Sequence, residues 1–401
     1  MTESNKTDRA LIDRLDATAM LARTCAWSEI NSGTRNLSGL ATIAGLLADA
    51  FSVLPGSLSL VDGDEAENVG IDGGVTRLAH GQHLRLTVRP EAPVQMLLTG
   101  HMDTVYPAGH AFQSLTWRDA NTLNGPGVAD MKGGLSVMLE ALRVVEDAGT
   151  PSLGYEVIIN SDEETGSFSS ARLIADAARG KHAALTYEPA LPDGTLAGAR
   201  GGTGNFSILV RGCAAHAGRN PEDGRNAIVA ASEIALRLHE ARSPRLSVNP
   251  ARVDGGGPNN VVPDLAVLRV NFRPGDAGEI ERARRLIADV TAAAATRHDV
   301  HVEVHGSFNR PPKPIDHAAA RLFALVKDAG LTLDLNVAWR DTGGVCDGNN
   351  IAAAGVPVVD TMGVRGGAIH SSDEFLLVDS LTERAALSAL TIKRIAEGAL
   401  L

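Results

Sequence analysis

Several side chains of this 401-residue chain are of the types that bind divalent metal ions. Carboxylates and imidazoles are the ligands that zinc and similar cations prefer when no thiolate cluster is present. The candidates share a position beside the end of an expected strand or helix: His101, Asp130, Glu163, Glu164, Glu188 and His370. Taken singly, Asp130 also fits a helix N-cap, and Asp162–Glu164 also fits a solvated acidic turn. Their shared placement favours a metal site.

The dipeptide spacing in His101-Met102-Asp103 supports this interpretation. A metal-bound imidazole usually donates a hydrogen bond from its other ring N–H to a carboxylate or carbonyl, which fixes its tautomer. We expect Asp103 to hydrogen-bond the far nitrogen of His101 in this way.

The elements that must position these residues alternate along the chain. Short apolar runs at 94–98, 157–159 and 183–187 alternate with helical periodicity, which predicts a largely parallel sheet flanked by helices. Helices are also expected over 11–51, broken by a polar turn at 31–36. Ligand sites of such α/β folds lie at the carboxyl edge of the sheet, where the polar clusters follow the strands.

A different pattern occupies residues 201–311. It predicts strands at 206–210, 245–253, 265–273 and 300–304 and helices at 222–241 and 276–297, the ferredoxin-like βαββαβ order. The proline-rich stretch 310–314 predicts a stiff connection back to the α/β pattern. We therefore expect an α/β catalytic domain made of residues 1–200 and 312–401, with an inserted ferredoxin-like domain over 201–311.

Composition excludes some partners. With 37 basic and 48 acidic residues the formal charge is −11, which argues against nucleic acid and against anionic membrane surfaces. The three cysteines are far apart, without a disulfide framework or a CxxC metal knuckle. The N-terminal segment 1–14 is polar, and no apolar run long enough for a membrane span follows. These features predict a cytoplasmic protein.

Six motifs resemble those of the dinuclear zinc peptidases and amidohydrolases that include glutamate carboxypeptidase, aminoacylase, acetylornithine deacetylase and succinyl-diaminopimelate desuccinylase. They lie in family order at 100–105, 127–134, 162–167, 187–189, 215–218 and 370–374, and the resemblance is nearest to the glutamate carboxypeptidase branch. It implies two Zn²⁺ per subunit, with Co²⁺ or Mn²⁺ as substitutes, and a homodimer through the inserted domain, which serves as a lid in this family.

The resemblance also implies roles for the metal ligands. Asp130 would bridge the two metals, His101 and Glu188 would complete one site, and Glu164 and His370 would complete the other.

Two further residues would act on the reaction itself. Glu163, left unligated, would be the general base on a metal-bridging water, with Asp103 supporting the catalytic set. His216 matches a lid histidine that stabilises the oxyanion, often from the partner subunit. An exposed loop position is the alternative for His216.

Substrate contacts are also implied. Asn260 matches a lid asparagine, while Arg273 and Arg310 align with positions that bind a substrate carboxylate, which suits the planar guanidinium. Arg273 also fits the polar face of a sheet, and Arg310 also fits a residue that flanks the hinge. The stretch 343–349 offers backbone amides to a carboxylate or forms a structural turn.

The main functional hypothesis is a dizinc hydrolase of the amide bond between an acyl or peptidyl group and a C-terminal amino acid with a free carboxylate. One alternative is a deacylase for a small N-acyl amino acid. A non-catalytic metal- or ligand-binding relative is an alternative of another class.

Overall fold

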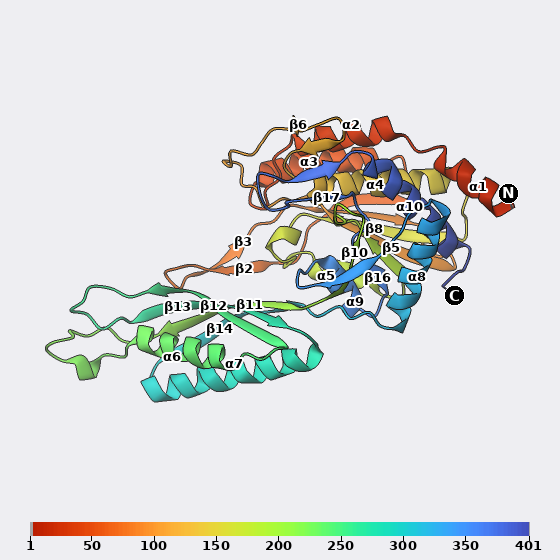
Figure 1. The fold of residues 1–401 in the computed structure, drawn as a ribbon. Coiled ribbons are helices and arrows are strands. Elements are labelled where there is room, and N and C mark those ends of the chain that lie inside the picture. Colours follow the sequence, from red (N-terminus) through yellow and green to blue (C-terminus); the bar gives the residue numbers. More distant parts are fainter. Residues whose placement is uncertain (1–2, 401) are drawn as a thin grey trace.

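A six-stranded sheet lies at the centre of the larger part of the computed structural model, which describes residues 3–400 (Figure 1). Its order is β1 (Ser57–Val61), β4 (His83–Val88), β8 (Leu153–Asn160), β5 (Val94–His101), β9 (Ala183–Thr186) and β16 (Val358–Val359). The last four are parallel, as predicted, whereas β4 is antiparallel to β8 and β1 to β4. Met1, Thr2 and Leu401 lie outside the described residues, so the N-terminal prediction is only partly covered.

Helices cover both faces of this sheet. One face packs against α2 (Ala17–Ser28), α3 (Leu37–Phe51), α4 (Gly133–Asp147), α8 (His317–Thr332) and α10 (Ser380–Ala396). The other packs against α5 (Ala171–Ala178) and α9 (Asp347–Ala353). On β5, Met96 and Leu98 enter the first core and Leu97 the second. Burial on both faces explains why these strands are continuous apolar runs.

The inserted segment forms a four-stranded antiparallel sheet with its own core. The strand order is β12 (Leu246–Gly255), β13 (Leu265–Pro274), β11 (Thr203–Arg211) and β14 (His301–Arg310). Helices α6 (Ala227–Glu240) and α7 (Ala277–His298) pack on one face, which gives the predicted βαββαβ order. The helix expected from residue 222 begins at Ala227, because η3 (Pro221–Asp223) is a separate turn and Asn226 caps the helix.

A hairpin from the larger part covers some of the opposite face of this sheet. Strands β2 (Ala66–Val69) and β3 (Val75–Leu78) form the hairpin, and Val69 packs against Leu209 and Val267. The side chain of Arg269 donates to the carbonyl of Val69 at 2.7 Å. The inserted domain is therefore fixed by more than its two chain connections.

Those two connections pair with each other. Backbone groups of Arg200 and Lys313 exchange two hydrogen bonds of 2.9 Å. The buried carboxylate of Asp360 binds both side chains, with Arg200 Nε at 2.7 Å and Lys313 Nζ at 3.1 Å. A single buried acid thus joins the chain's entry into the inserted domain to its exit.

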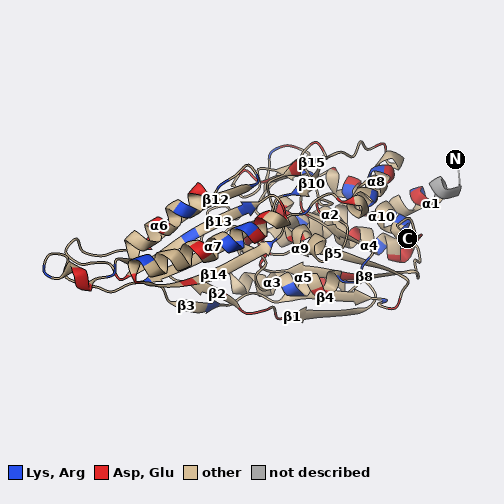
Figure 2. Cartoon of the chain, turned by 90° about the horizontal axis from the view of Figure 1, so that it is seen from below, with Lys and Arg blue, Asp and Glu red and all other residues tan. Residues whose placement is uncertain are grey.

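The remaining elements are short or peripheral: α1 (Glu3–Ile12), β10 (Leu196–Arg200) paired with β15 (Trp339–Thr342), and a sheet of β17 (Gly366–Gly367), β18 (Phe375–Leu377), β7 (Thr122–Asn124) and β6 (Thr116–Trp117). Basic and acidic segments are interspersed along α6, α7 and α8 (Figure 2). Within residues 3–400, no helix combines the length and apolarity that a membrane crossing requires.

Candidate metal centre

Three neighbouring parallel strands deliver most of the candidate ligands. Strand β5 ends at His101, β8 is followed by the turn η2 (Glu163–Thr165), and β9 is followed by Glu188. Since the carboxyl ends of parallel strands meet at one sheet edge, these side chains converge. The structure therefore has these side chains at the carboxyl edge of the sheet, where the sequence predicted them.

Asp130 is held by a loop that Glu374 organises. The loop contains η1 (Val128–Lys132) and begins at Gly127, whose φ of 71° favours glycine. The buried carboxylate of Glu374 accepts the backbone N–H groups of Gly127, Ala129 and Asp130 at 3.0–3.1 Å. Asp130 is not a side-chain N-cap, so the helix-capping alternative is wrong.

His370 reaches the same place from the loop between β17 and β18. Its Nε2 lies 3.3 Å from Asp130 Oδ2 and 3.2 Å from Glu164 Oε2, and 53% of its side chain is exposed. On the other side of Asp130, Oδ1 lies 3.1 Å from His101 Nε2, which in turn lies 3.8 Å from Glu188 Oε2. The two oxygens of Asp130 therefore face two different sets of donors.

Two groups of ligand atoms are close enough to hold a cation. Atoms of His101, Asp130 and Glu164 lie within 4.8 Å of one another, and so do atoms of His101, Glu163 and Glu188. Both groups are largely buried. The ligand types and their spacing fit a borderline divalent metal.

Asp103 supports His101 as expected, but through its backbone carbonyl and not through its carboxylate. Its Nδ1 lies 2.9 Å from the backbone carbonyl oxygen of Asp103, whereas the Asp103 carboxylate is 3.5 Å away. That carboxylate instead accepts the N–H groups of Glu163 and Glu164 at 3.1 and 3.2 Å and the hydroxyl of Thr34 at 2.6 Å. Asp103 thus orients the imidazole with its main chain and the η2 turn with its side chain.

Crowded negative charge dominates the electrostatics. Burial raises the pKa of Glu163 to about 7 and that of Glu164 to about 8, with neighbouring carboxylates adding to both effects. Burial alone would lower the pKa of His101, but Asp103, Asp130 and Glu188 raise it well above its ordinary value. A buried surplus of carboxylates is costly unless cations offset it, so the donor set fits bound divalent metals.

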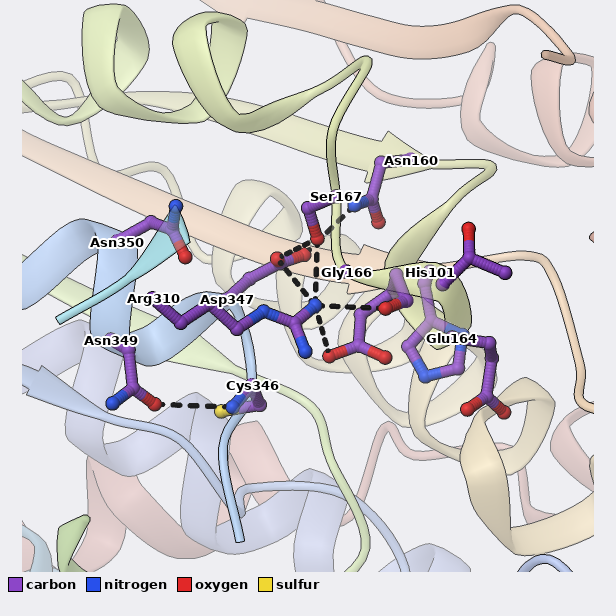
Figure 3. Close-up of polar contacts among 12 residues, drawn as sticks. His101, Asn160, Glu164, Gly166, Ser167, Arg310, Cys346, Asp347, Asn349 and Asn350 are labelled. Carbon is purple, nitrogen blue, oxygen red and sulfur yellow. Dashed lines mark hydrogen bonds and ion pairs between the residues drawn. The ribbon is translucent and has the colours of Figure 1, made fainter. Parts of the chain in front are cut away.

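Glu163 has one strong cationic partner. Arg310 Nη2 lies 2.7 Å from Glu163 Oε1 and donates to the backbone oxygen of Glu163 at 2.8 Å. The same nitrogen donates to Ser167 Oγ at 2.7 Å, and Asp347 lies beside it (Figure 3). Arg310 therefore flanks the proline-rich connection and is also a buried neighbour of the expected base.

A single cavity of about 570 Å³ joins this cluster to cationic side chains. Asp130, Glu163, Glu164, Glu188 and His370 lie on its wall, and Arg273 and Arg310 line it as well. Other wall residues were not assigned a role from sequence: Arg200, Asn205, Asn271, Asn309, Arg340 and Cys346. The one available signal was the polar alternation of Arg269, Asn271 and Arg273 on β13.

His216 and Asn260 do not line this cavity. The loops that carry them lie side by side, since Ala217 N–H donates to Asn260 O at 2.9 Å. The residues His216 and Asn260 are both exposed. Strand β11 runs away from the larger part, so the loops that follow β11 and β12 lie at the distal end (Figure 1). The antiparallel β13 and β14 return, which brings Arg273 and Arg310 to the cavity. The predicted sites of His216 and Asn260 are thus not assembled within one chain.

Comparison with known proteins supplies independent evidence. The family described as peptidase family M20/M25/M40 matches residues 97–394. Carboxypeptidase G2 from Pseudomonas sp. (strain RS-16) is 29% identical over 348 residues, 83% of each chain. A succinyl-diaminopimelate desuccinylase from Methylococcus capsulatus is 28% identical over 331 residues, covering 75% of this chain and 83% of that protein.

A solved structure agrees in fold. A tripeptidase from Staphylococcus aureus subsp. aureus Mu50 superposes with a TM-score of 0.72 at 24% identity, covering 96% of this chain and 99% of that one. This likeness extends to the α/β part and the inserted domain together.

Proposed function

The chain belongs to peptidase family M20/M25/M40, and from this premise we propose that it is a dizinc hydrolase of the amide bond between an acyl or peptidyl group and a C-terminal amino acid with a free carboxylate. Family membership makes it a metal-dependent enzyme that hydrolyses amide bonds. The observation that carries the finer proposal is the shared cavity, which places the metal-ligand cluster and two arginines around one space.

Five residues would hold the metals. Asp130 would bridge, with His101 and Glu188 on its Oδ1 side and Glu164 and His370 on its Oδ2 side. When bound, zinc, cobalt or manganese would polarise the scissile carbonyl and lower the pKa of the attacking water. Glu374 would keep the carboxylate of Asp130 in place through its hydrogen bonds to the backbone of Gly127, Ala129 and Asp130.

Glu163 would carry the proton. Its Oε1 is bound by Arg310, and no described residue donates to its Oε2. That oxygen would accept the proton of the attacking water and return it to the leaving amine. Burial of the side chain excludes bulk water from this exchange.

Arg273 and Arg310 would bind the substrate carboxylate. Arg273 Nε donates only to Asn271 Oδ1 at 3.0 Å among the described residues, so most of its guanidinium is unpaired. Arg310 Nη1 likewise has no hydrogen-bond partner in residues 3–400, whereas Nη2 is engaged by Glu163. Charge-assisted hydrogen bonds from these groups suit a terminal carboxylate.

The inserted domain would complete the site from another subunit. We propose boundaries of 201–311 for this lid, with residues 1–200 and 312–401 forming the catalytic domain, and a homodimer through the lid. The exposed loops of His216 and Asn260 would then reach a partner's cavity, where His216 would stabilise the oxyanion. Sedimentation equilibrium tests the dimer. We also propose a cytoplasmic location, which the three unpaired cysteines support.

The decisive experiment measures amino-acid release by the zinc-loaded protein from N-acyl amino acids and dipeptides with varied C-terminal residues. Glu163→Ala with equal metal content is the control. Release confined to acidic C-terminal residues would support a carboxypeptidase like the Pseudomonas relative. Release only from succinylated or acetylated diamino acids would favour the deacylase alternative, which the 28% identity to a desuccinylase supports. Equal turnover by Glu163→Ala would refute the assignment of the base.

A further inference from the structure

The start of α9 makes contacts that the proposed reaction does not yet explain. Cys346 caps this helix, and its first residues bind the segment that leaves the inserted domain. Asn349 Nδ2 donates to the carbonyl of Pro311 at 2.7 Å, and Asn350 Nδ2 donates to the carbonyl of Asn309 at 2.9 Å. Two amides therefore hold the backbone on both sides of Arg310.

Asp347 acts on the side chain of the same arginine. Asp347 is 1% exposed, and its carboxylate accepts hydrogen bonds from Ser167 Oγ at 2.5 Å and Asn160 Nδ2 at 2.9 Å (Figure 3). Its Oδ1 also lies 3.5 Å from Arg310 Nη2. Ser167 touches both partners, because its Oγ accepts from Arg310 at 2.7 Å. Nη2 of Arg310 is thus contacted by Ser167 and Asp347 as well as by Glu163.

The nitrogen of Arg310 that Ser167 and Asp347 contact is the same one that contacts the proposed base, Glu163. Arg310 Nη2 contacts Glu163 Oε1 at 2.7 Å and the backbone oxygen of Glu163 at 2.8 Å. Arg310 is 5% exposed and Glu163 6%, so this contact is shielded from water. If Nη2 is fixed, Oε1 of Glu163 is fixed as well, and the direction of Oε2 follows from it.

We propose that Asp347 is a positioning residue for the general base: together with Ser167 it sets Arg310 against Glu163, so that Oε2 of Glu163 faces the attacking water. The proposal rests on the role of Glu163 in the proposed function. Asp347 is not itself a wall residue of the cavity and has no hydrogen bond to a candidate metal ligand among the described residues, so it would act through Arg310. In this proposal the stretch 343–349, which contains Asp347, positions the base in addition to forming a turn.

The expected effect falls mainly on turnover, because Ser167 and Asp347 contact Nη2 of Arg310 whereas the substrate carboxylate would bind the unpaired Nη1. A base displaced by about 1 Å loses roughly 10²-fold in rate, and residues that support a site typically contribute 10- to 100-fold. We expect Asp347→Asn to lower kcat by about 10- to 100-fold while KM changes by less than about threefold and metal content stays the same. Ser167→Ala is expected to act in the same direction.

The test compares Asp347→Asn, Ser167→Ala and the double variant with wild type. Because both residues act through Arg310, the double variant is expected to lose no more than the worse single variant, whereas independent structural damage would multiply. Glu140→Gln is the matched control: Glu140 is a fully buried acid that pairs with Arg23 and Arg143 outside the cavity. It is expected to lower Tm and leave kcat unchanged.

Several outcomes would overturn the proposal. These are a kcat of Asp347→Asn within threefold of wild type, a loss carried by KM, or a loss matched by Glu140→Gln. If wild type turns over no substrate in the panel, the proposed function fails separately, and crystal structures of the zinc-loaded proteins decide. Glu163 Oε1 still 2.7 Å from Arg310 in Asp347→Asn would refute the positioning role. If Asp347→Asn does not fold, Ser167→Ala carries the same measurements.

Discussion

Replacing Glu374 with glutamine tests whether the Asp130 loop is held as described. Glu374 Oε1 accepts the N–H groups of Ala129 and Asp130, both at 3.0 Å. Oε2 accepts the N–H of Gly127 at 3.1 Å and the hydroxyl of Tyr106 at 2.9 Å. Glutamine keeps one oxygen and turns the other acceptor into an NH₂ donor. It can satisfy the first pair only by opposing the N–H of Gly127.

The size of the effect follows from that one mismatch. A buried donor without an acceptor costs about 1–3 kcal/mol, so we expect Glu374→Gln to lower the free energy of unfolding of the metal-free protein by this amount. Because the N–H of Asp130 is one of the bound groups, we expect the carboxylate of Asp130, the proposed metal bridge, to shift as well. Loss of such support typically weakens metal affinity by about 10- to 100-fold.

Urea unfolding of the metal-free protein and competition with a chelator measure the two effects. Both are run at pH 8, since burial and Asp130 raise the pKa of Glu374 to about 7 and the carboxylate is then ionised. Asp373→Asn is the matched control, because Asp373 is 83% exposed and pairs with Arg118. If Glu374→Gln unfolded at the wild-type urea concentration and bound zinc as tightly, the reasoning would be wrong.

Three further outcomes are expected. Arg273→Gln should raise KM for substrates with a free carboxylate by about 10- to 100-fold, because a charge-assisted hydrogen bond contributes about 1.5–3 kcal/mol, with kcat nearly unchanged in steady-state assays; an unchanged KM would remove Arg273 from the binding site. Chelation of the metal should abolish turnover and lower Tm in calorimetry, since cations that bind only the folded state stabilise it, and both should return with zinc. Burial lowers the pKa of His83 below its ordinary 6.5 despite the opposing charge of Asp162, so the folded state binds fewer protons there than the unfolded state. The stability that neutral His83 contributes is therefore complete above pH 6.5 and is lost as pH falls below it; urea unfolding of His83→Gln between pH 5 and 8 should show a flatter profile, and a slope identical to wild type would contradict this.

The convergence of the candidate site residues was predictable because it depends on local order. His101, Glu163, Glu164 and Glu188 each follow a strand of one parallel sheet, so strand prediction alone brings them to one edge. Burial on both faces gives those strands an unmistakable apolar pattern. Strands β1 and β4 were missed because their apolar residues alternate with polar ones, a pattern that resembles many surface segments.

His370 was a candidate by residue type, but only family resemblance paired it with Asp130 and Glu164. His370 lies 240 residues after Asp130, in an irregular loop where its own φ is 62°. No sequence periodicity predicts that its side chain contacts Asp130. Glu374 was likewise visible as a motif member, yet its four hydrogen bonds depend on a loop folded beside it.

The two-part architecture and the candidate ligand types were predictable from local sequence, since apolar periodicity and strand-end chemistry are local properties. Which arginine contacts Glu163 could be seen only in the folded chain, because Arg310 lies on a distant segment whose backbone accepts hydrogen bonds from Asn349 and Asn350. The tertiary structure also separated His216 from the cavity of its own chain, because strand polarity carries that loop to the far end of the inserted domain. Such contacts arise from how packed elements meet, which residue spacing does not encode.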